Sequence, residues 1–244
     1  MITPDQLYAA IDGTWPAAQF VTTGPWKLRD GQGGGKRVSA ASTDDMVTPE
    51  DIQTAVEGLA GFGQAPLFMV KPDQSALDAQ LAMLGYEVID PCNAYAAPVE
   101  AMLDTPVPRV TILPHWEPLA IAREIWAEAG IGPARVEVMK RVKGPKVTLL
   151  GRHKDKPAGV AHVGIHENIA MLHALEILPH QRRQGMGQWF MRVAAIWARD
   201  NGADVLTVIC TKANDGANAL YTSLGMQAVG GYHYRYLPYE KDRT

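Results

Sequence analysis

Cysteine is almost absent from this chain, since the 244 residues contain only Cys92 and Cys210. Two cysteines cannot build a disulfide scaffold or a four-cysteine zinc site, and such sparing use is typical of a reducing compartment. An excess of basic charge is also lacking, because 23 Lys and Arg residues stand against 26 Asp and Glu. The net charge is −3, so the chain has no excess of positive charge to attract phosphate groups, and we expect no nucleic-acid partner.

Long apolar runs are missing as well. No stretch approaches the roughly 18 to 20 uninterrupted apolar residues that a membrane helix needs. The opening segment MITPDQLYAA has neither the basic leader nor the apolar stretch of a signal peptide. The apolar share of 47% is nevertheless ordinary for a globular protein with a real core. These features predict a cytoplasmic protein without membrane contact.

Proline and glycine punctuate the first hundred residues, and three prolines within 98–108 mark a linker between two domains. Before the linker, the sequence predicts a hairpin that turns at Gly31 and Gly33–Gly35, then a helix over 48–60 capped by Thr48. Beyond it, strands and helices alternate. We expect strands at 146–152, 158–166, 169–178 and 205–210, and helices at 117–128, 187–202 and 215–224. This alternation predicts an α/β fold with a mixed sheet.

One short pattern occurs twice. The segment LAMLGYEV at 81–88 resembles YTSLGMQAV at 221–229, and each follows an apolar strand and a helix. Two copies of one fold would explain this similarity simply, although a glycine that ends a helix is common enough to produce the similarity by chance.

The strongest local signal is the segment PHQRRQGMG at 179–187, between an apolar strand and an amphipathic helix. Gly185 and Gly187 let the backbone approach a ligand, and the helix start presents unpaired N–H groups and the positive end of its dipole. Arg182 and Arg183 add positive charge. The segment therefore predicts a pyrophosphate cradle, against the alternative of a loop that only needs glycine at a helix start.

Two other nucleotide-binding patterns are disfavoured. The loop lacks the third glycine of G-x-G-x-x-G, because residue 190 is Phe. The glycines of 31–35 precede Lys36 and Arg37, but Arg37 stands where a nucleotide loop needs Ser or Thr to bind magnesium.

Two motifs carry a specific resemblance. Arg182-x-x-Gly185-x-Gly187 resembles the Q/R-x-x-G-x-G/A motif of the GNAT superfamily of N-acetyltransferases. Asn214-x-x-Ala217-x-x-Leu220-Tyr221-x-x-Leu224-Gly225-Met226 is similar to the family's second acetyl-CoA motif, with Met where Phe is usual. The match covers about residues 108–238. The first hundred residues lack these motifs, but their layout resembles a degenerate copy, as in tandem members of the superfamily.

The resemblance implies a GNAT-like acyl-CoA N-acyltransferase fold with two halves, a degenerate one over 1–100 and a catalytic one over 108–244. It implies acetyl transfer from acetyl-CoA, the cosubstrate, to the amine of a small molecule or peptide by direct attack in a ternary complex, without a metal. The residues that it assigns to cofactor binding are Leu175, Ile177, Arg182, Arg183, Gln184, Gly185, Met186, Gly187 and Asn214.

Tyr221 is the candidate general acid. Asn214, Ala217 and Tyr221 stand at i, i+3 and i+7 and share one helix face, so a ligand lying along that helix could meet both Asn214 and Tyr221. A phenol of pKa near 10 suits the protonation of a departing thiolate. The alternative is that Tyr221 only packs the helix on the sheet.

The general base has two candidates on one strand. The segment Leu172-His-Ala-Leu175 resembles a strand of the arylalkylamine N-acetyltransferases, whose histidine at this place is the catalytic base, which implies His173. Glu176 is an acid in an apolar strand, an expensive placement unless it is paired or functional. Strand alternation puts the two residues on opposite faces unless a bulge intervenes, and the family usually has such a bulge. The spacing therefore does not decide which residue is the base, and water or another side chain is a third possibility.

Two further patterns bear on the chemistry. His162 and His166 lie about 13 Å apart in an extended strand, too far to share a metal ion. A non-catalytic acyl-CoA sensor remains the competing class, but it would need the loop and not Tyr221, so we favour the enzyme.

Overall fold

Two units, each built from separate stretches of sequence, make up the fold. The computed structural model describes residues 2–109 and 111–238. Unit 1 comprises the chain up to Pro16, Ala94–Cys210 and Asn214–Val229, and unit 2 comprises Ala17–Asn93, Thr211–Ala213 and the chain from Gly230. These units divide the chain at other places than the expected ranges 1–100 and 108–244. That the first range is a degenerate copy of the second stays a prediction.

Unit 1 contains a mixed sheet, as the sequence predicts. Its strands follow the order β4-β9-β8-β7-β6-β5, in which β5 to β8 pair antiparallel and β8 pairs parallel with β9. Parallel neighbours need a crossover connection, which helix α6 provides here. The strands are β4 (Glu87–Pro98), β5 (Ile112–His115), β6 (Lys146–His153), β7 (Lys156–His166), β8 (Ile169–Ile177) and β9 (Val205–Thr211).

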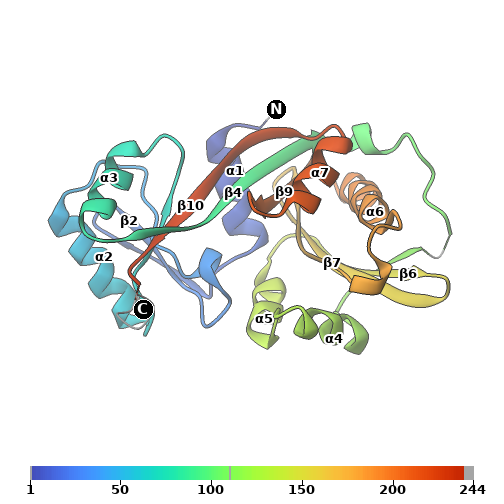
Figure 1. Cartoon of the computed structure of the whole chain (residues 1–244), viewed down its shortest axis with the longest axis horizontal. Helices are drawn as coiled ribbons and strands as arrows, with labels where there is room; N and C mark the ends of the chain where they lie inside the picture. Colours follow the sequence, from blue (N-terminus) through green and yellow to red (C-terminus); the bar gives the residue numbers. More distant parts are fainter. Residues whose placement is uncertain (1, 110, 239–244) are drawn as a thin grey trace. The chain divides into compact units, whose positions relative to one another are not determined.

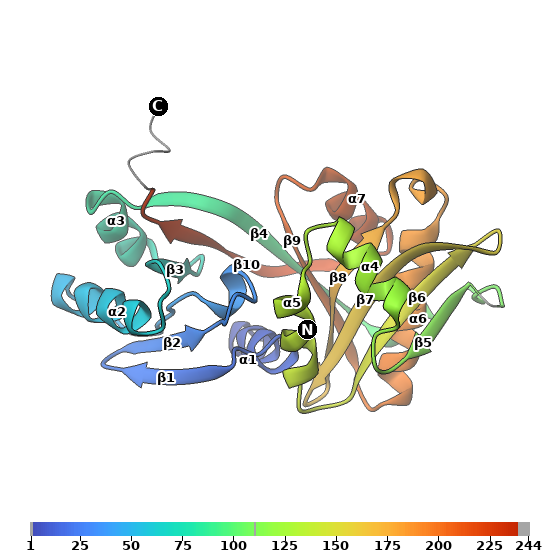
Figure 2. The ribbon, with the colours of Figure 1, turned by 90° about the horizontal axis from the view of Figure 1, so that it is seen from below.

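Helices cover both faces of this sheet. Helices α6 (Met186–Asp200) and α7 (Asp215–Ser223) lie on one side of β6 and β7, and α4 (Ala120–Glu128) and α5 (Pro133–Arg141) on the other (Figure 1). In the view from below, α4 lies across β7 and β8 on the near side (Figure 2). Leu172 packs with Phe190 in the core beneath α6. Because side chains alternate along a strand, the neighbouring His173 faces the opposite side.

Helix α1 (Pro4–Thr14) packs on β7 through two glycines. A Cβ at Gly13 would lie 2.3 Å from His166 Nδ1, and one at Gly164 would lie 3.2 Å from Thr14 Cβ. Only glycine therefore lets the helix and the strand come this close. The end of α1 is thereby fixed against the sheet at His173, far away in sequence.

Unit 2 holds a hairpin and a three-strand array. Strand β1 (Gln19–Thr23) pairs with β2 (Trp26–Asp30), and the turn between them is Gly24-Pro25, with Gly24 at φ +55°. The predicted reversal at Gly31 and Gly33–Gly35 is also present, because Lys27 of β2 forms an antiparallel bridge to Ser42. The second strand expected there is wrong, since Lys36–Val38 form a 3-10 helix. Strand β10 (Gln227–Tyr236) lies between β3 (Leu67–Val70) and β4.

The helices of unit 2 begin as local chemistry predicts. Helix α2 (Pro49–Gly61) starts after Thr48, whose side chain accepts from the Asp51 N–H while Asp51 accepts from the Thr48 N–H. This reciprocal cap satisfies two backbone donors at the helix start. Helix α3 (Ser75–Met83) follows β3. Within residues 2–109 and 111–238, no helix has the length and apolar character needed to cross a membrane.

Asp78 links α3 to β10 and is expected to stabilise unit 2 near neutral pH. Its carboxylate accepts two bonds from Arg235, at 2.7 and 3.0 Å, and one from His233 at 2.6 Å. The bonds from Arg235 hold the pKa of Asp78 below its usual value, so its stabilisation is present near neutral pH and is lost as pH falls through the lowered pKa. Asp78→Asn should cost about 1–3 kcal/mol at pH 7 and less at pH 3.

Urea unfolding followed by circular dichroism measures this difference. Asp73→Asn, at an exposed carboxylate of the same unit, is the matched control. Equal losses in the two variants, or a loss that does not shrink at pH 3, would contradict the assignment.

Candidate active site

The loop between β8 and α6 lies where the motif predicts it. A short 3-10 turn (Pro179–Gln181) follows β8, and α6 begins at Met186. Gly185 precedes the helix with φ +79°, a left-handed conformation that favours glycine, and the exposed Arg183 has φ +60°. The first N–H groups of a 15-residue helix therefore open onto a loop that carries exposed arginine.

The two glycines of the motif have different surroundings. A Cβ at Gly185 would meet only Trp189 Nε1, at an ordinary 3.8 Å. A Cβ at Gly187 would lie 2.8 Å from Leu220 Cδ2, so Gly187 is needed for the close approach of α6 to α7. Met186 is buried in the core. Gly185 is thus the glycine in the exposed loop, and Gly187 serves the packing behind it.

Polar bonds fix the rest of this loop to the end of β8. The Arg182 guanidinium bonds Glu176 Oε1 at 2.9 Å and the carbonyl oxygen of Ile177 at 2.9 Å. Gln184 Nε2 donates to the carbonyl oxygen of His180 at 3.1 Å. Glu176, one of the two candidate bases, is therefore an ion-pair partner of the loop, and Arg183 is exposed.

Strand β8 bulges between its two candidate bases. The register with β7 shifts between Val160, opposite Glu176, and His162, opposite His173, and Ala174 has φ +50°. The extra residue cancels the odd spacing, so His173 and Glu176 lie on the same face of the sheet. The bulge that the sequence analysis allowed for is present. Because both residues lie on one face, strand alternation does not decide which of them is the base.

Strands β8 and β9 pair only over their first part. The ladder runs from Ile169 opposite Val205 to Leu172 opposite Val208, although β8 continues to Ile177 and β9 to Thr211. The pairing therefore ends beside His173. Leu175 and Ile177 lie in the part of β8 that does not pair with β9, and they are partly buried against the core beneath α6.

His173 is held by two residues of α1 and its end. The Thr14 hydroxyl lies 2.9 Å from His173 Nε2, and the ring of Trp15 lies 4.8 Å from the imidazole, centroid to centroid. Thr14, Trp15 and His173 are all buried. Sequence reasoning missed Thr14 and Trp15, because they stand about 160 positions before the histidine and carry no local motif.

His162 lies beside His173 as a second buried ring. The two imidazoles are stacked with centroids 6.3 Å apart, and Trp116 packs on His162 at 5.9 Å. Burial lowers the pKa of His162 to about 3, and the nearby Lys146 ammonium adds to the shift. His162 is therefore uncharged near neutral pH.

Tyr221 belongs to the opposite face. It is 5% exposed within the core that contains Leu172 and Phe190, and its ring lies 5.7 Å from that of Tyr95. Burial raises the pKa of the Tyr221 hydroxyl, so this group stays protonated at neutral pH. Asn214 caps α7, since its side-chain oxygen accepts from the Ala217 N–H at 3.0 Å. Ala217 and Tyr221 lie on α7, whereas Asn214 precedes the helix as its cap, so a ligand contact shared by Asn214 and Tyr221 stays a prediction.

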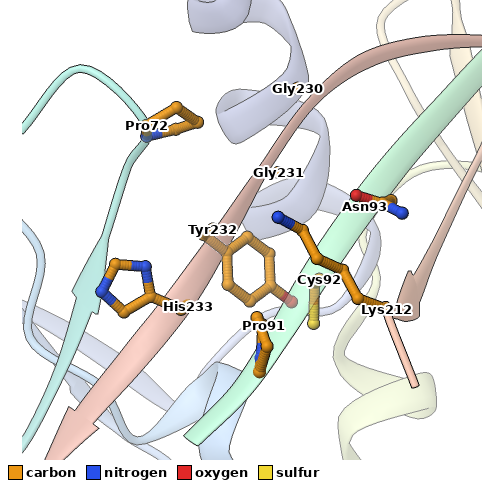
Figure 3. A pocket seen from close by; sticks show the side chains of 9 residues that line it. All are labelled: Pro72, Pro91, Cys92, Asn93, Lys212, Gly230, Gly231, Tyr232 and His233. Carbon is orange, nitrogen blue, oxygen red and sulfur yellow. The ribbon is translucent and has the colours of Figure 1, made fainter. Parts of the chain in front are cut away.

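Unit 2 has a pocket of its own between strands β4 and β10. Figure 3 shows Cys92 on β4 and Tyr232 on β10 beside the side chain of Lys212. Arg37 Nε donates to the Tyr232 hydroxyl at 3.0 Å, and burial raises the pKa of the Cys92 thiol. The residues that line this pocket are Pro72, Pro91, Cys92, Asn93, Lys212, Gly230, Gly231, Tyr232 and His233. They include none of the site residues expected from the sequence.

Within residues 2–109 and 111–238, no group of three or more His, Cys, Asp or Glu side chains could hold a metal ion.

The mixed sheet, in which parallel β8 and β9 separate, lies next to the start of α6, whose first N–H groups have no partner within the helix. Residues 116–226 match the acetyltransferase (GNAT) family, and this part of the chain is a GNAT acetyltransferase domain. The resemblance inferred from the two motifs is confirmed, as is the GNAT-like fold.

Known proteins resemble the chain over most of its length. An uncharacterized N-acetyltransferase of Bacillus subtilis strain 168, YobR, is 24% identical over 233 residues, covering 91% of this chain and 94% of the relative. A solved GCN5-related N-acetyltransferase from Kribbella flavida has a TM-score of 0.71 at 19% identity, covering 98% of this chain and 97% of its own. A tandem GNAT protein from the clavulanic acid biosynthesis pathway has a TM-score of 0.58 at 14% identity, covering 80% and 74%.

Proposed function

We propose that the protein is an acetyl-CoA-dependent N-acetyltransferase that acts on the amine of a small molecule or peptide. One observation carries this proposal. His173 directly follows the last residue of β8 that pairs with β9, and Tyr221 lies on the other face of the sheet, close to Cys210 of β9. A thioester lying between the separated strands would have a proton acceptor on one side and a proton donor on the other.

The residues around the strand separation suit the parts of acetyl-CoA. The N–H groups at the start of α6, with Gly185 and Arg183, would hold the pyrophosphate, since a helix N-terminus attracts anions. The unpaired edge of β8 at Leu175 and Ile177 would bond the amides of the pantetheine arm. Arg182, Gln184, Met186 and Gly187 would shape the loop, and Asn214 would set the start of α7.

His173 and Tyr221 divide the proton chemistry of the transfer. His173 takes the proton that the attacking amine loses as the amide C–N bond forms. Tyr221 gives its proton to the sulfur as the thioester C–S bond breaks, and both residues recover their starting state through solvent. Each role typically raises the reaction rate by about 10²–10⁴-fold. Glu176 positions Arg182 in this scheme, because its carboxylate is paired with that guanidinium.

Release of free CoA thiol from acetyl-CoA in the presence of pooled amines tests the activity directly. Thiol release that depends on an added amine supports the proposal. CoA binding measured by calorimetry without any thiol release would instead indicate a binding-only role, which needs the loop but not Tyr221. The predicted degenerate range 1–100 lacks the Arg-x-x-Gly-x-Gly motif, and we expect it to bind no CoA.

Arg183→Glu is expected to weaken CoA binding about 10-fold or more. It replaces an attraction to phosphate by a repulsion at an exposed loop position, and hydrogen bonds to charged groups are worth about 1.5–3 kcal/mol. Isothermal titration with CoA at two salt concentrations measures the loss. Arg199→Glu makes the same charge change at the far end of α6 and should leave the affinity within about 2-fold. Equal affinity in both variants would contradict the loop assignment.

A further inference from the structure

The Thr14 hydroxyl has a definite hydrogen-bond direction. Its oxygen lies 2.6 Å from the carbonyl oxygen of Ala10 and 2.9 Å from His173 Nε2. A carbonyl oxygen can only accept, and a threonine hydroxyl has a single hydrogen. That hydrogen therefore goes to Ala10, and the Thr14 oxygen must accept from His173.

This direction fixes which nitrogen of His173 carries the proton. A neutral imidazole has one N–H and one lone pair, and the partner of one nitrogen selects the tautomer. Because Nε2 faces an acceptor, it is the protonated nitrogen. The lone pair that can take up a further proton is then on Nδ1.

The contact is rigid and shielded from water. Thr14 is 0% and His173 5% exposed, so water does not compete for the hydroxyl. Gly13 and Gly164 bring α1 into close packing with β7, and Trp15 lies over the imidazole at an interplanar angle of 34°. The imidazole is therefore held both by its ring face and by Nε2.

Several titratable groups lie on the elements around His173. His162 on the facing strand is uncharged near neutral pH. Glu176, on the same strand, is paired with Arg182. The other titratable groups on the elements at this face are Asp5, Tyr8 and Asp12 on α1, Lys146, Arg152 and His153 on β6, Lys156 and His166 on β7, Arg123, Glu124 and Glu128 on α4, and Arg135, Glu137, Lys140 and Arg141 on α5.

We propose that Thr14 is a positioning residue that keeps neutral His173 in the Nε2–H tautomer, so that Nδ1 is the atom that accepts the proton of the amine. The proton-accepting role rests on the proposed function. The tautomer does not, because it follows from the hydrogen bonds of Thr14 alone.

Histidine ¹⁵N NMR of the full chain tests the tautomer without any acetyl transfer. Loss of one set of ring signals in His173→Gln assigns the residue. We expect the Nε2–H pattern in the wild type at a pH where the ring is neutral. An Nδ1–H pattern there would overturn the proposal, whatever the activity of the protein.

Two substitutions of Thr14 separate the hydroxyl from the packing. Thr14→Val keeps the shape and removes the acceptor, whereas Thr14→Ser keeps the hydroxyl. In Thr14→Val we expect a mixture of tautomers and a turnover about 10-fold lower, with Thr14→Ser close to wild type in both respects.

The pH profile gives a second readout. The Thr14 oxygen bonds a cationic imidazolium more strongly than a neutral ring, so its loss lowers the pKa of His173. The acid limb of the turnover profile in Thr14→Val should move down by about 0.5–1 pH unit. A valine variant with the wild-type tautomer overturns the positioning role. An altered tautomer with unchanged turnover and pH profile overturns the role of Nδ1.

Discussion

Tyr221→Phe is expected to lower turnover about 10²-fold while CoA affinity and stability stay near wild type. The substitution removes one hydroxyl and keeps the ring that packs against Tyr95 in the core. If Tyr221 protonates the departing thiolate, the loss should shrink for an acetyl thioester of a more acidic thiol, whose leaving group needs less help. Steady-state kinetics with both donors, together with CoA calorimetry, measure these effects.

Tyr95→Phe is the matched control for this experiment. It removes the hydroxyl that donates to Asn218 Oδ1 at 2.7 Å, next to the same helix, without touching the proposed acid. We expect a loss below about 3-fold. Burial raises the pKa of Tyr221, so the wild type should also show no alkaline limb from this group up to about pH 10. Equal losses in the two phenylalanine variants would leave Tyr221 as a packing residue.

His173→Ala is expected to lower turnover about 10²–10³-fold at pH 7 and to recover partly as pH approaches 10. Amines have a pKa near 10, so at high pH the acceptor is already deprotonated and needs no base. A packing defect has no reason to respond to the ionisation of the acceptor. The turnover profile from pH 6 to 10, measured beside the wild type, makes this distinction.

Two neighbours of His173 provide the controls. His162→Phe keeps a buried ring beside His173 and leaves the proposed base in place, so it should keep most of the activity. Glu176→Gln releases Arg182 and should weaken CoA binding more than it lowers turnover. If Glu176→Gln abolishes turnover while His173→Ala remains active, the base is Glu176.

Local chemistry explains what the sequence could predict. The loop before Met186, the cap at Thr48 and the helix that carries Tyr221 each depend on residues within one or two turns of each other. The GNAT motifs are of this kind, and they located the fold and the candidate cofactor loop.

Contacts between distant residues escaped prediction. Thr14 and His173 are 159 positions apart, and their hydrogen bond depends on the packing of Gly13 against His166, which no periodicity reveals. The roles of the two loop glycines differ for the same reason, because Leu220 belongs to another helix. The pairing of Glu176 with Arg182 was equally hidden, since charge patterns do not say which ion pairs form.

The alternation of the chain between the two units limits where recombination between related genes can occur without mixing parts of one unit. Unit 1 takes its first helix from the stretch up to Pro16 and its last strand residues from the stretch up to Val229. A single crossover between two diverged genes anywhere from residue 17 to 93 would join the α1 of one parent to the rest of unit 1 from the other. Thr14 and His173 would often come from different ancestors, and recombination is therefore expected to preserve this protein as one block.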